Sequence, residues 1–137
     1  MSEDSLRSVG LERIERSRYA ITNARGGRLE IGTGDDADFT PVELLLAAIA
    51  GCTAIDVDLL TTKRAEPEHF RVEATGHKQA EHVLDDLQVL FDVAFGDDEA
   101  GRTAQERVAG AIATSHDRLC TVSRTVERGT PVESRER

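Results

Sequence analysis

The chain has 137 residues, with 26 acidic against 17 basic side chains and a net charge of −9 at pH 7. This charge argues against nucleic acid and an anionic membrane surface as partners, because both are negatively charged and would repel it. A chain of this length suits one domain with a modest core, so we predict a single domain over residues 1–137. Arginine supplies 15 of the basic residues and lysine two, a balance typical of salt-adapted proteins and equally of a GC-rich coding bias.

Residues 9–31 have the pattern of short strands. Polar and apolar side chains alternate over residues 9–14, 18–22 and 28–31, and the segment Asn23–Gly27 is rich in turn-forming residues. Alternation interrupted by an Asn-to-Gly cluster predicts strands that are joined by a tight turn. We expect a three-stranded meander, followed by a turn-rich loop over residues 32–38.

A long helix is predicted to start after residue 40. Thr40 suits the N-cap, Pro41 suits the first helical position, and Glu43 completes a capping box. We expect this helix to run to about Arg64. Because it is apolar on nearly every face as far as Ile55, it should be enclosed on all sides.

The second half of the chain continues with strands and then a helix. Residues 70–74 and 87–95 alternate in polarity and predict two longer strands that pair as a hairpin. Asp97 or Asp98 is the expected cap of a second helix, which ends near Cys120. In the tail we expect Gly129 to act as a stop and one edge strand to form over residues 130–133. The resulting order, β-β-β-α-β-β-α-β, is an α+β fold.

The sequence predicts a cytoplasmic protein with no membrane partner. Its longest apolar run, residues 44–55, has twelve residues and is closed by Asp56 and Asp58. A bilayer takes about 20 apolar residues, so we interpret this run as a core helix. The first six residues include two acids and lack a positive start followed by an apolar stretch, so no secretory signal is predicted.

The chain has two cysteines, Cys52 in the long helix and Cys120 after the second helix. A single buried cysteine is usually a small apolar packing residue, so the sequence around each thiol decides whether more is expected. Residues 41–56, PVELLLAAIAGCTAID, resemble the nucleophile helix of the OsmC/Ohr superfamily, and residues 119–125, LCTVSRT, resemble its second cysteine segment. The likeness covers nearly the whole chain and includes the order of the elements.

The resemblance implies an OsmC-like fold built as an intertwined homodimer, with long central helices packed between sheets and active sites at the subunit interface. It also implies a dithiol peroxidase that reduces organic hydroperoxides in oxidative-stress defence, without a metal or other cofactor. The counterpart of Cys52 attacks the peroxide as a thiolate and becomes a sulfenic acid. The counterpart of Cys120 then forms a disulfide with it, and a dithiol reductant, often lipoyl, restores both thiols.

A thiolate at Cys52 needs a nearby positive charge. Cys52 lies beyond the first turn of its helix, where the helix dipole has faded, so an arginine must lower the pKa of its thiol. In the peroxidases that the chain resembles, this arginine comes from the N-terminal hairpin. Counting back from the turn at Gly27 places Arg18 at the matching position. Arg16 and Arg25 are alternatives, because short strands define their register weakly.

The chain departs from the peroxidases that it resembles at two positions. The carboxylate that orients the arginine in those proteins directly follows the helix proline, and Val42 occupies that position here. Glu43 stands nine residues before Cys52, and nine residues turn a helix by about 900°, which puts the two on opposite sides. Glu43 is therefore expected mainly to cap the helix, and a supporting catalytic role is the alternative. Thr121 replaces the proline that usually follows the second cysteine.

Two further side chains bear on the thiols. Asp56, four residues after Cys52, shares its helical face and would raise the pKa of the thiol unless it is paired, and we expect an arginine or a backbone donor as its partner. His116, together with Cys52 and Cys120, has the residue types of a zinc site. Three ligands without a Cys-x-x-Cys or His-x-x-x-His pair are a weak signal, so no metal is predicted.

Two other functions stay open on the sequence. A non-catalytic dimer could bind a small apolar molecule or sense oxidants through its thiols, and a structural dimer could use both cysteines for packing alone. The reactivity of Cys52 towards an alkyl hydroperoxide separates these from a peroxidase.

Overall fold

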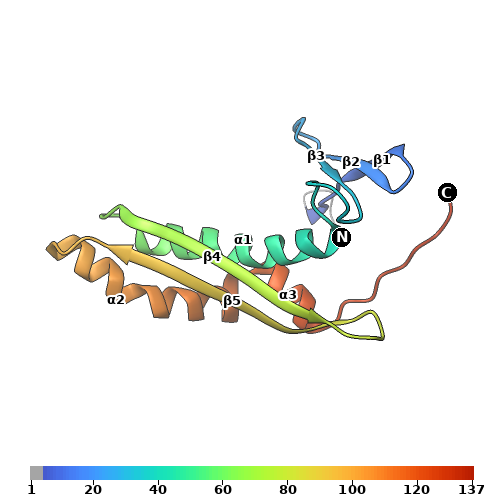
Figure 1. Cartoon of the computed structure of the whole chain (residues 1–137). Coiled ribbons are helices and arrows are strands. Elements are labelled where there is room, and N and C mark those ends of the chain that lie inside the picture. The colour runs from blue at the N-terminus through green and yellow to red at the C-terminus, as the bar shows by residue number, and fades with distance from the viewer. Residues whose placement is uncertain (1–4) are drawn as a thin grey trace. The chain divides into compact units, whose positions relative to one another are not determined.

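Two β-sheets and three α-helices make up residues 5–137, the part of the chain that the computed structural model describes (Figure 1). In chain order the elements are β1 Gly10–Glu15, β2 Arg18–Thr22, β3 Arg28–Ile31, α1 Pro41–Thr61, β4 Pro67–Lys78, β5 Leu84–Phe95, α2 Glu99–Thr114, the π-helical turn η2 Ser115–Leu119 and α3 Thr121–Arg128. The predicted α+β class is confirmed. The chain divides into two compact units, Met1–Leu45 and Leu46–Arg137, with the boundary inside α1, and the single domain stays a prediction.

The first unit contains the predicted meander. Its three strands are antiparallel in the order β1-β2-β3, with β2 in the centre. Asn23 closes the turn before β3, because its side-chain oxygen accepts from the N–H of Gly27 at 2.9 Å. Gly26 has a φ of 93°, in the left-handed region that favours glycine. The Asn-to-Gly cluster therefore forms the tight turn that the sequence predicts.

Helix α1 begins where the capping signal predicts. The Glu43 N–H donates to Thr40 Oγ1 at 3.1 Å, and the Thr40 N–H donates to Glu43 Oε1 at 2.8 Å. These two bonds form a reciprocal capping box, which satisfies two backbone donors that the helix leaves free. The helix ends at Thr61, three residues short of the predicted Arg64.

The second unit is organised around the long hairpin of β4 and β5. The two strands pair antiparallel from Pro67 opposite Phe95 onwards, as predicted, and both strands extend beyond the predicted ranges. The rings of Phe70 and Phe91 meet edge to face across the pair, with centroids 6.2 Å apart. Such cross-strand aromatic pairs stabilise a hairpin beyond the area they bury.

Helix α2 follows β5 and packs against it. Asp98 is its N-cap, one of the two predicted candidates, and accepts from the Gly101 N–H at 2.7 Å. One turn further on, the Gln105 side chain accepts from the Phe95 N–H at 2.9 Å and donates to the Val93 carbonyl at 3.1 Å. These bonds tie the helix to the end of the strand.

The C-terminal segment differs from the prediction. Instead of an edge strand, the chain forms the turn η2 and the short helix α3, and residues 130–137 form neither strand nor helix. Pro131 has no N–H to contribute to a strand ladder, which disfavours the predicted strand over residues 130–133. Gly129 ends α3 with a φ of 68°, so its predicted role as a stop is confirmed.

One face of α1 is buried and another is exposed. The buried residues recur every four positions, at Ile49, Thr53, Val57 and Thr61. Ile55 and Leu59 are 63% and 66% exposed, so within a single chain the predicted enclosure on all sides is not met. By length and composition α1 would also pass as a membrane span, a test that core helices of soluble proteins pass as well.

Candidate functional site: a pair of thiols

The structure brings the two predicted cysteines together. Cys52 lies in the second half of α1 and is half-buried, whereas Cys120 joins η2 to α3 and is fully buried. Both are free thiols, and each contributes to the pKa shift of the other, which places the two side chains close together. The Cys120 sulfur accepts from the Ser123 N–H in the first turn of α3, where a helix leaves its backbone donors without intrahelical partners.

Three donors and acceptors surround the Cys120 sulfur. The Thr53 hydroxyl donates to it at 3.6 Å, the Ser123 N–H donates to it at 3.4 Å, and the Cys120 thiol donates to Ser123 Oγ at 3.3 Å. Burial acts to raise the pKa of Cys120, but the hydrogen bonds from Ser123, Thr53 and Cys52 outweigh it and lower that pKa below its ordinary value. The hydrogen bonds around Cys120 therefore favour its ionised form.

The pKa of the Cys52 thiol is shifted the other way. Burial raises it most, the Val122 N–H in the first turn of α3 lowers it, and both Cys120 and Asp56 raise it further. The net result is a raised pKa. Cys120 is thus the more acidic thiol of the pair, and the groups around Cys52 in the second unit do not supply the lowered pKa that a nucleophilic role requires.

Asp56 has a partner that the sequence did not predict. The hydroxyl of Ser115, at the start of η2, donates to Asp56 Oδ2 at 2.7 Å, and Ser115 is fully buried. The expected arginine or backbone donor is replaced by this hydroxyl. A hydroxyl is neutral and does not cancel the charge of the carboxylate. Asp56 therefore raises the pKa of Cys52, as we expected for an aspartate without a positively charged partner.

A largely apolar cavity of about 250 Å³ lies next to Thr53 and Ser123, with His116 and Glu127 as its charged lining residues. Its apolar lining comes from α1, β5, α2 and α3, through Ile49, Leu87, Val89, Phe91, Ile112 and Val126. Thr53 and Ser123, the two residues that contact the Cys120 sulfur, are also in its wall. The cavity therefore adjoins the groups that hold Cys120.

His116 is bound by carboxylates on both sides. Its Nδ1 lies 3.0 Å from Asp117 Oδ1 and its Nε2 lies 2.7 Å from Glu127 Oε1, which ties η2 to α3. The two carboxylates raise the pKa of His116. Both ring nitrogens are thus engaged. Over residues 5–137, no group of three or more His, Cys, Asp or Glu side chains is arranged to hold a metal ion.

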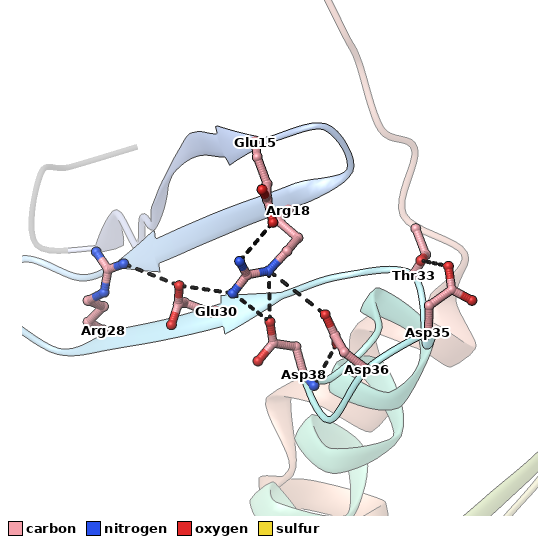
Figure 2. Close-up of polar contacts among 8 residues, drawn as sticks. All are labelled: Glu15, Arg18, Arg28, Glu30, Thr33, Asp35, Asp36 and Asp38. Atoms are coloured by element: carbon pink, nitrogen blue, oxygen red, sulfur yellow. Dashed lines mark hydrogen bonds and ion pairs between the residues drawn. The ribbon is translucent and has the colours of Figure 1, made fainter.

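Arg18, in the first unit, is the centre of an acidic cluster (Figure 2). Its guanidinium lies 3.0 Å from Glu15, 3.3 Å from Glu30, 3.9 Å from Asp36 and 3.1 Å from Asp38. Hydrogen bonds to Glu15 and Asp38 raise the pKa of Arg18 above its ordinary value. The side chain points to carboxylates of its own unit, which come from β1, β3 and the loop before α1.

The other residues of the predicted activating group are placed as follows. Arg16 lies in the turn between β1 and β2 and Arg25 in the turn before β3, and both are exposed. Glu43 forms the capping box of α1, as predicted, and within residues 5–137 it is not among the carboxylates that contact Arg18. The activating role of Arg18 and the supporting role of Glu43 stay predictions.

Sequence reasoning missed the hydroxyl residues of the site. Thr53 and Ser115 are buried, and Ser123 lies in the first turn of α3. A weak signal for Ser123 exists, because a cysteine three residues before it has the spacing of an N-cap that accepts from the third helical residue. Thr53 had no such signal, since its contact with Cys120 spans 67 residues of chain.

The fold and the site together define a class: a small α+β protein with two free thiols close together near the start of a short helix, and a largely apolar cavity next to the residues that hold one of them. Residues 32–135 match the family described as OsmC-like protein. Uncharacterised proteins of Mycobacterium tuberculosis and Mycobacterium bovis are 30% identical over 128 residues, covering 89% of this chain and 90% of theirs. The chain therefore belongs to the OsmC-like family.

Solved structures share its fold. A hypothetical protein from Aquifex aeolicus superimposes with a TM-score of 0.72 at 20% identity, covering 92% of this chain and 90% of its own. An OsmC-like protein from Mycoplasma pneumoniae gives 0.68 at 14% identity, with 90% and 89% covered. The organic hydroperoxide resistance protein OhrB of Bacillus subtilis gives 0.55 at 15% identity, with 89% and 92% covered. The resemblance to the OsmC/Ohr superfamily is confirmed.

Proposed function

We propose that the protein is a thiol-dependent peroxidase that reduces organic hydroperoxides in defence against oxidative stress. The observation that carries the proposal is the proximity of Cys52 on α1 to Cys120 at the start of α3, where each thiol contributes to the pKa shift of the other. Two thiols that lie close together can form a disulfide where their Cα and Cβ atoms suit its geometry. Membership of the OsmC-like family, and the fold shared with the organic hydroperoxide resistance protein OhrB of Bacillus subtilis, support the same chemistry.

The proposed reaction uses both thiols in turn. The Cys52 thiolate attacks the outer oxygen of the hydroperoxide, the O–O bond breaks, and the alkoxide leaves and takes a proton to become the alcohol. Cys52 is then a sulfenic acid. The Cys120 thiolate attacks its sulfur, hydroxide leaves and takes a proton to become water, and a disulfide remains. A dithiol reductant, such as a lipoyl group, exchanges with this disulfide and is itself oxidised.

The cavity favours an alkyl substituent on the peroxide. Six apolar side chains line about 250 Å³ of space next to Thr53 and Ser123. Burying alkyl groups there stabilises the complex by about 0.8 kcal/mol for each CH₂. A hydroperoxide with an apolar tail should therefore react faster than hydrogen peroxide.

A count of free thiols, with the intact mass, tests the reaction directly. One equivalent of cumene hydroperoxide should remove both thiols and two hydrogen atoms of mass per chain, and a dithiol should restore them. Cys52→Ser should abolish turnover, whereas Cys120→Ser should trap Cys52 as a sulfenic acid. Unchanged turnover in Cys52→Ser would refute the peroxidase.

Arg18 is our proposed activator of Cys52, on the strength of the family resemblance. Arg18→Ala should raise the pKa of the Cys52 thiol and so shift its alkylation rate to higher pH. Arg16→Ala and Arg25→Ala, at the two exposed turns, serve as matched variants. If only one of the three variants shifts the dependence of the Cys52 alkylation rate on pH, the activating role belongs to the arginine that it replaces.

We also propose that the protein is a cytoplasmic homodimer. Ile55 and Leu59 expose apolar surface on α1, and a second copy of the chain would cover it. Leu59→Glu should reduce the dimer fraction in sedimentation, whereas Val132→Glu, at a residue that is 89% exposed in the tail, should not. A monomeric parent protein would contradict this proposal.

A second candidate function is the binding of a small apolar molecule. The same cavity favours it, because the cavity exists without any thiol chemistry. Two thiols that stay unreacted with cumene hydroperoxide, together with saturable binding of an apolar fluorescent probe, would favour this function over the peroxidase.

A further inference from the structure

The Cys120 sulfur is held by groups from two helices. Thr53 reaches it from the buried face of α1, and Ser123 reaches it through both its backbone N–H and its hydroxyl from α3. Thr53 is 6% exposed and Cys120 is fully buried, so water does not compete well for these bonds. Hydrogen bonds to a sulfur are stronger when the sulfur is an anion, and they favour the ionised form.

The two hydroxyls can act as donors to an anionic sulfur. The Thr53 hydroxyl already donates to Cys120. The Ser123 hydroxyl accepts from the protonated thiol, and because a hydroxyl is both donor and acceptor it can rotate to donate once the proton has left. With the Ser123 N–H, a thiolate at Cys120 would then have three donors from protein groups besides the Cys52 thiol.

We propose that Thr53 and Ser123 are positioning residues that hold the sulfur of Cys120 as an anion, aimed at Cys52, so that the disulfide forms as soon as Cys52 is oxidised. This inference rests on the proposed function. It adds that donors from α1 and α3 favour the ionised form of the second thiol before the peroxide arrives, and that one of these donors belongs to the residue next to Cys52 in sequence. The sulfenic acid of Cys52 would then form the disulfide before more peroxide could oxidise it to a sulfinic acid.

The step balances without an added base. The Cys120 thiolate supplies the electron pair of the new S–S bond, the S–O bond of the Cys52 sulfenic acid breaks, and hydroxide leaves and takes a proton from water or buffer. Cys52 and Cys120 together lose two electrons to the peroxide. A protonated Cys120 would have to lose its proton first, and the donors on Thr53 and Ser123 make this loss easier because they favour the anion.

Thr53→Val and Ser123→Ala test this inference, because each removes a hydroxyl and keeps the approximate shape. Thr53→Ser keeps a hydroxyl, so the pKa of Cys120 and the rate of disulfide formation should both match those of the parent protein. Thr61→Val is the matched control, since Thr61 is a buried threonine on the same face of α1 whose hydroxyl bonds to the Val57 carbonyl instead.

The first measurement needs no peroxide. In a Cys52→Ser background Cys120 is the remaining thiol, and its ionisation can be followed by the ultraviolet absorbance of the thiolate against pH. Thr53→Val and Ser123→Ala should each move the midpoint to higher pH, and Thr61→Val should leave it unchanged. If neither variant moves the midpoint relative to Thr61→Val, the inference is overturned, whatever the protein does with hydroperoxides.

The second measurement follows disulfide formation with both cysteines present. After one equivalent of cumene hydroperoxide, Thr53→Val should slow the conversion of the sulfenic acid to the disulfide by about fivefold, the rate equivalent of one modest hydrogen bond. The slowing should diminish as the pH is raised, because the remaining Cys120 then ionises without help. A slowing that is independent of pH would mean a merely structural effect and would overturn the inference. If no variant or parent reacts at all, the proposed function fails, while the titration still decides the inference.

Discussion

The Arg18 cluster and the thiol pair are each built around one polar centre, but their surroundings differ. Arg18 is 30% exposed and meets carboxylates whose exposure ranges from 27% to 62%. Cys120 is fully buried, and its partners are neutral hydroxyl and N–H groups. Charges near the surface are screened by salt, whereas neutral hydrogen bonds in a buried setting are not.

This difference shows how the chain uses its acidic composition. In the first unit four carboxylates surround one arginine, so the cluster carries an excess of negative charge. In the second unit the pKa of each thiol is controlled by burial and short-range hydrogen bonds, with one carboxylate, Asp56, nearby. The comparison predicts that stability of the first region depends on salt and that stability of the second depends on packing.

The largest effect is expected from the buried region. Val57 is fully buried on α1, and Val57→Ala removes two methyl groups and leaves a cavity, which should lower the free energy of unfolding by about 2 kcal/mol. Denaturant unfolding measures this loss, and it should be the same at low and high salt. Val132→Ala, in the exposed tail, is the control. A loss no larger than that of the control would show that α1 is not a packed core element.

A smaller effect, and one that depends on salt, is expected from the Arg18 cluster. Arg18→Met keeps much of the side-chain length but leaves four carboxylates without their central positive charge. The variant should be less stable than the parent at low salt, and the difference should shrink at about 1 M salt, where the Debye length is about 3 Å. Arg25→Met, in an exposed turn, is the control. A deficit that persists at high salt would contradict the electrostatic interpretation.

A local effect is expected at Cys52 from its acidic neighbour. Burial is the main cause of the raised pKa of Cys52, and the Asp56 carboxylate adds to it. Asp56→Asn keeps an oxygen that can accept from Ser115 and removes the charge, so the alkylation rate of Cys52 should shift to lower pH. Asp58→Asn, at an exposed residue of the same helix, should leave the curve in place. A shift in both variants would indicate a long-range charge effect instead.

The smallest effect is expected at His116. Its raised pKa means that its ion pairs with Asp117 and Glu127 stabilise the fold below the ordinary pKa of histidine, about 6.5. This contribution is lost as the pH rises through the raised value. The His116 side chain is 54% exposed, so screening limits the effect to a few tenths of a kcal/mol. In thermal unfolding, His116→Gln should be less stable than the parent by about a few tenths of a kcal/mol near pH 6. Near pH 9 the two proteins should be equally stable.

Local signals in the sequence predicted most of the elements. The capping box of Thr40 and Glu43, the Asn23 turn and the hairpin of β4 and β5 were all placed by interactions between residues close in sequence or by alternation. Helix α3 and η2 were missed, because a short helix after a π-helical turn leaves little periodicity to detect. The predicted tail strand was wrong for the same reason, since four residues with a proline carry almost no pattern.

The sequence by itself determined that two thiols lie in an α+β protein of the OsmC-like kind and that α1 begins with a capping box. The tertiary structure decided which groups set the pKa of each thiol. Thr53 meets Cys120 across 67 residues and Ser115 meets Asp56 across 59. Contacts of this range depend on how separate helices pack, which a helical or alternating pattern does not encode. Asp36 and Asp38, which also lie close to Arg18, come from the loop before α1, and an alternating strand pattern does not place loop side chains.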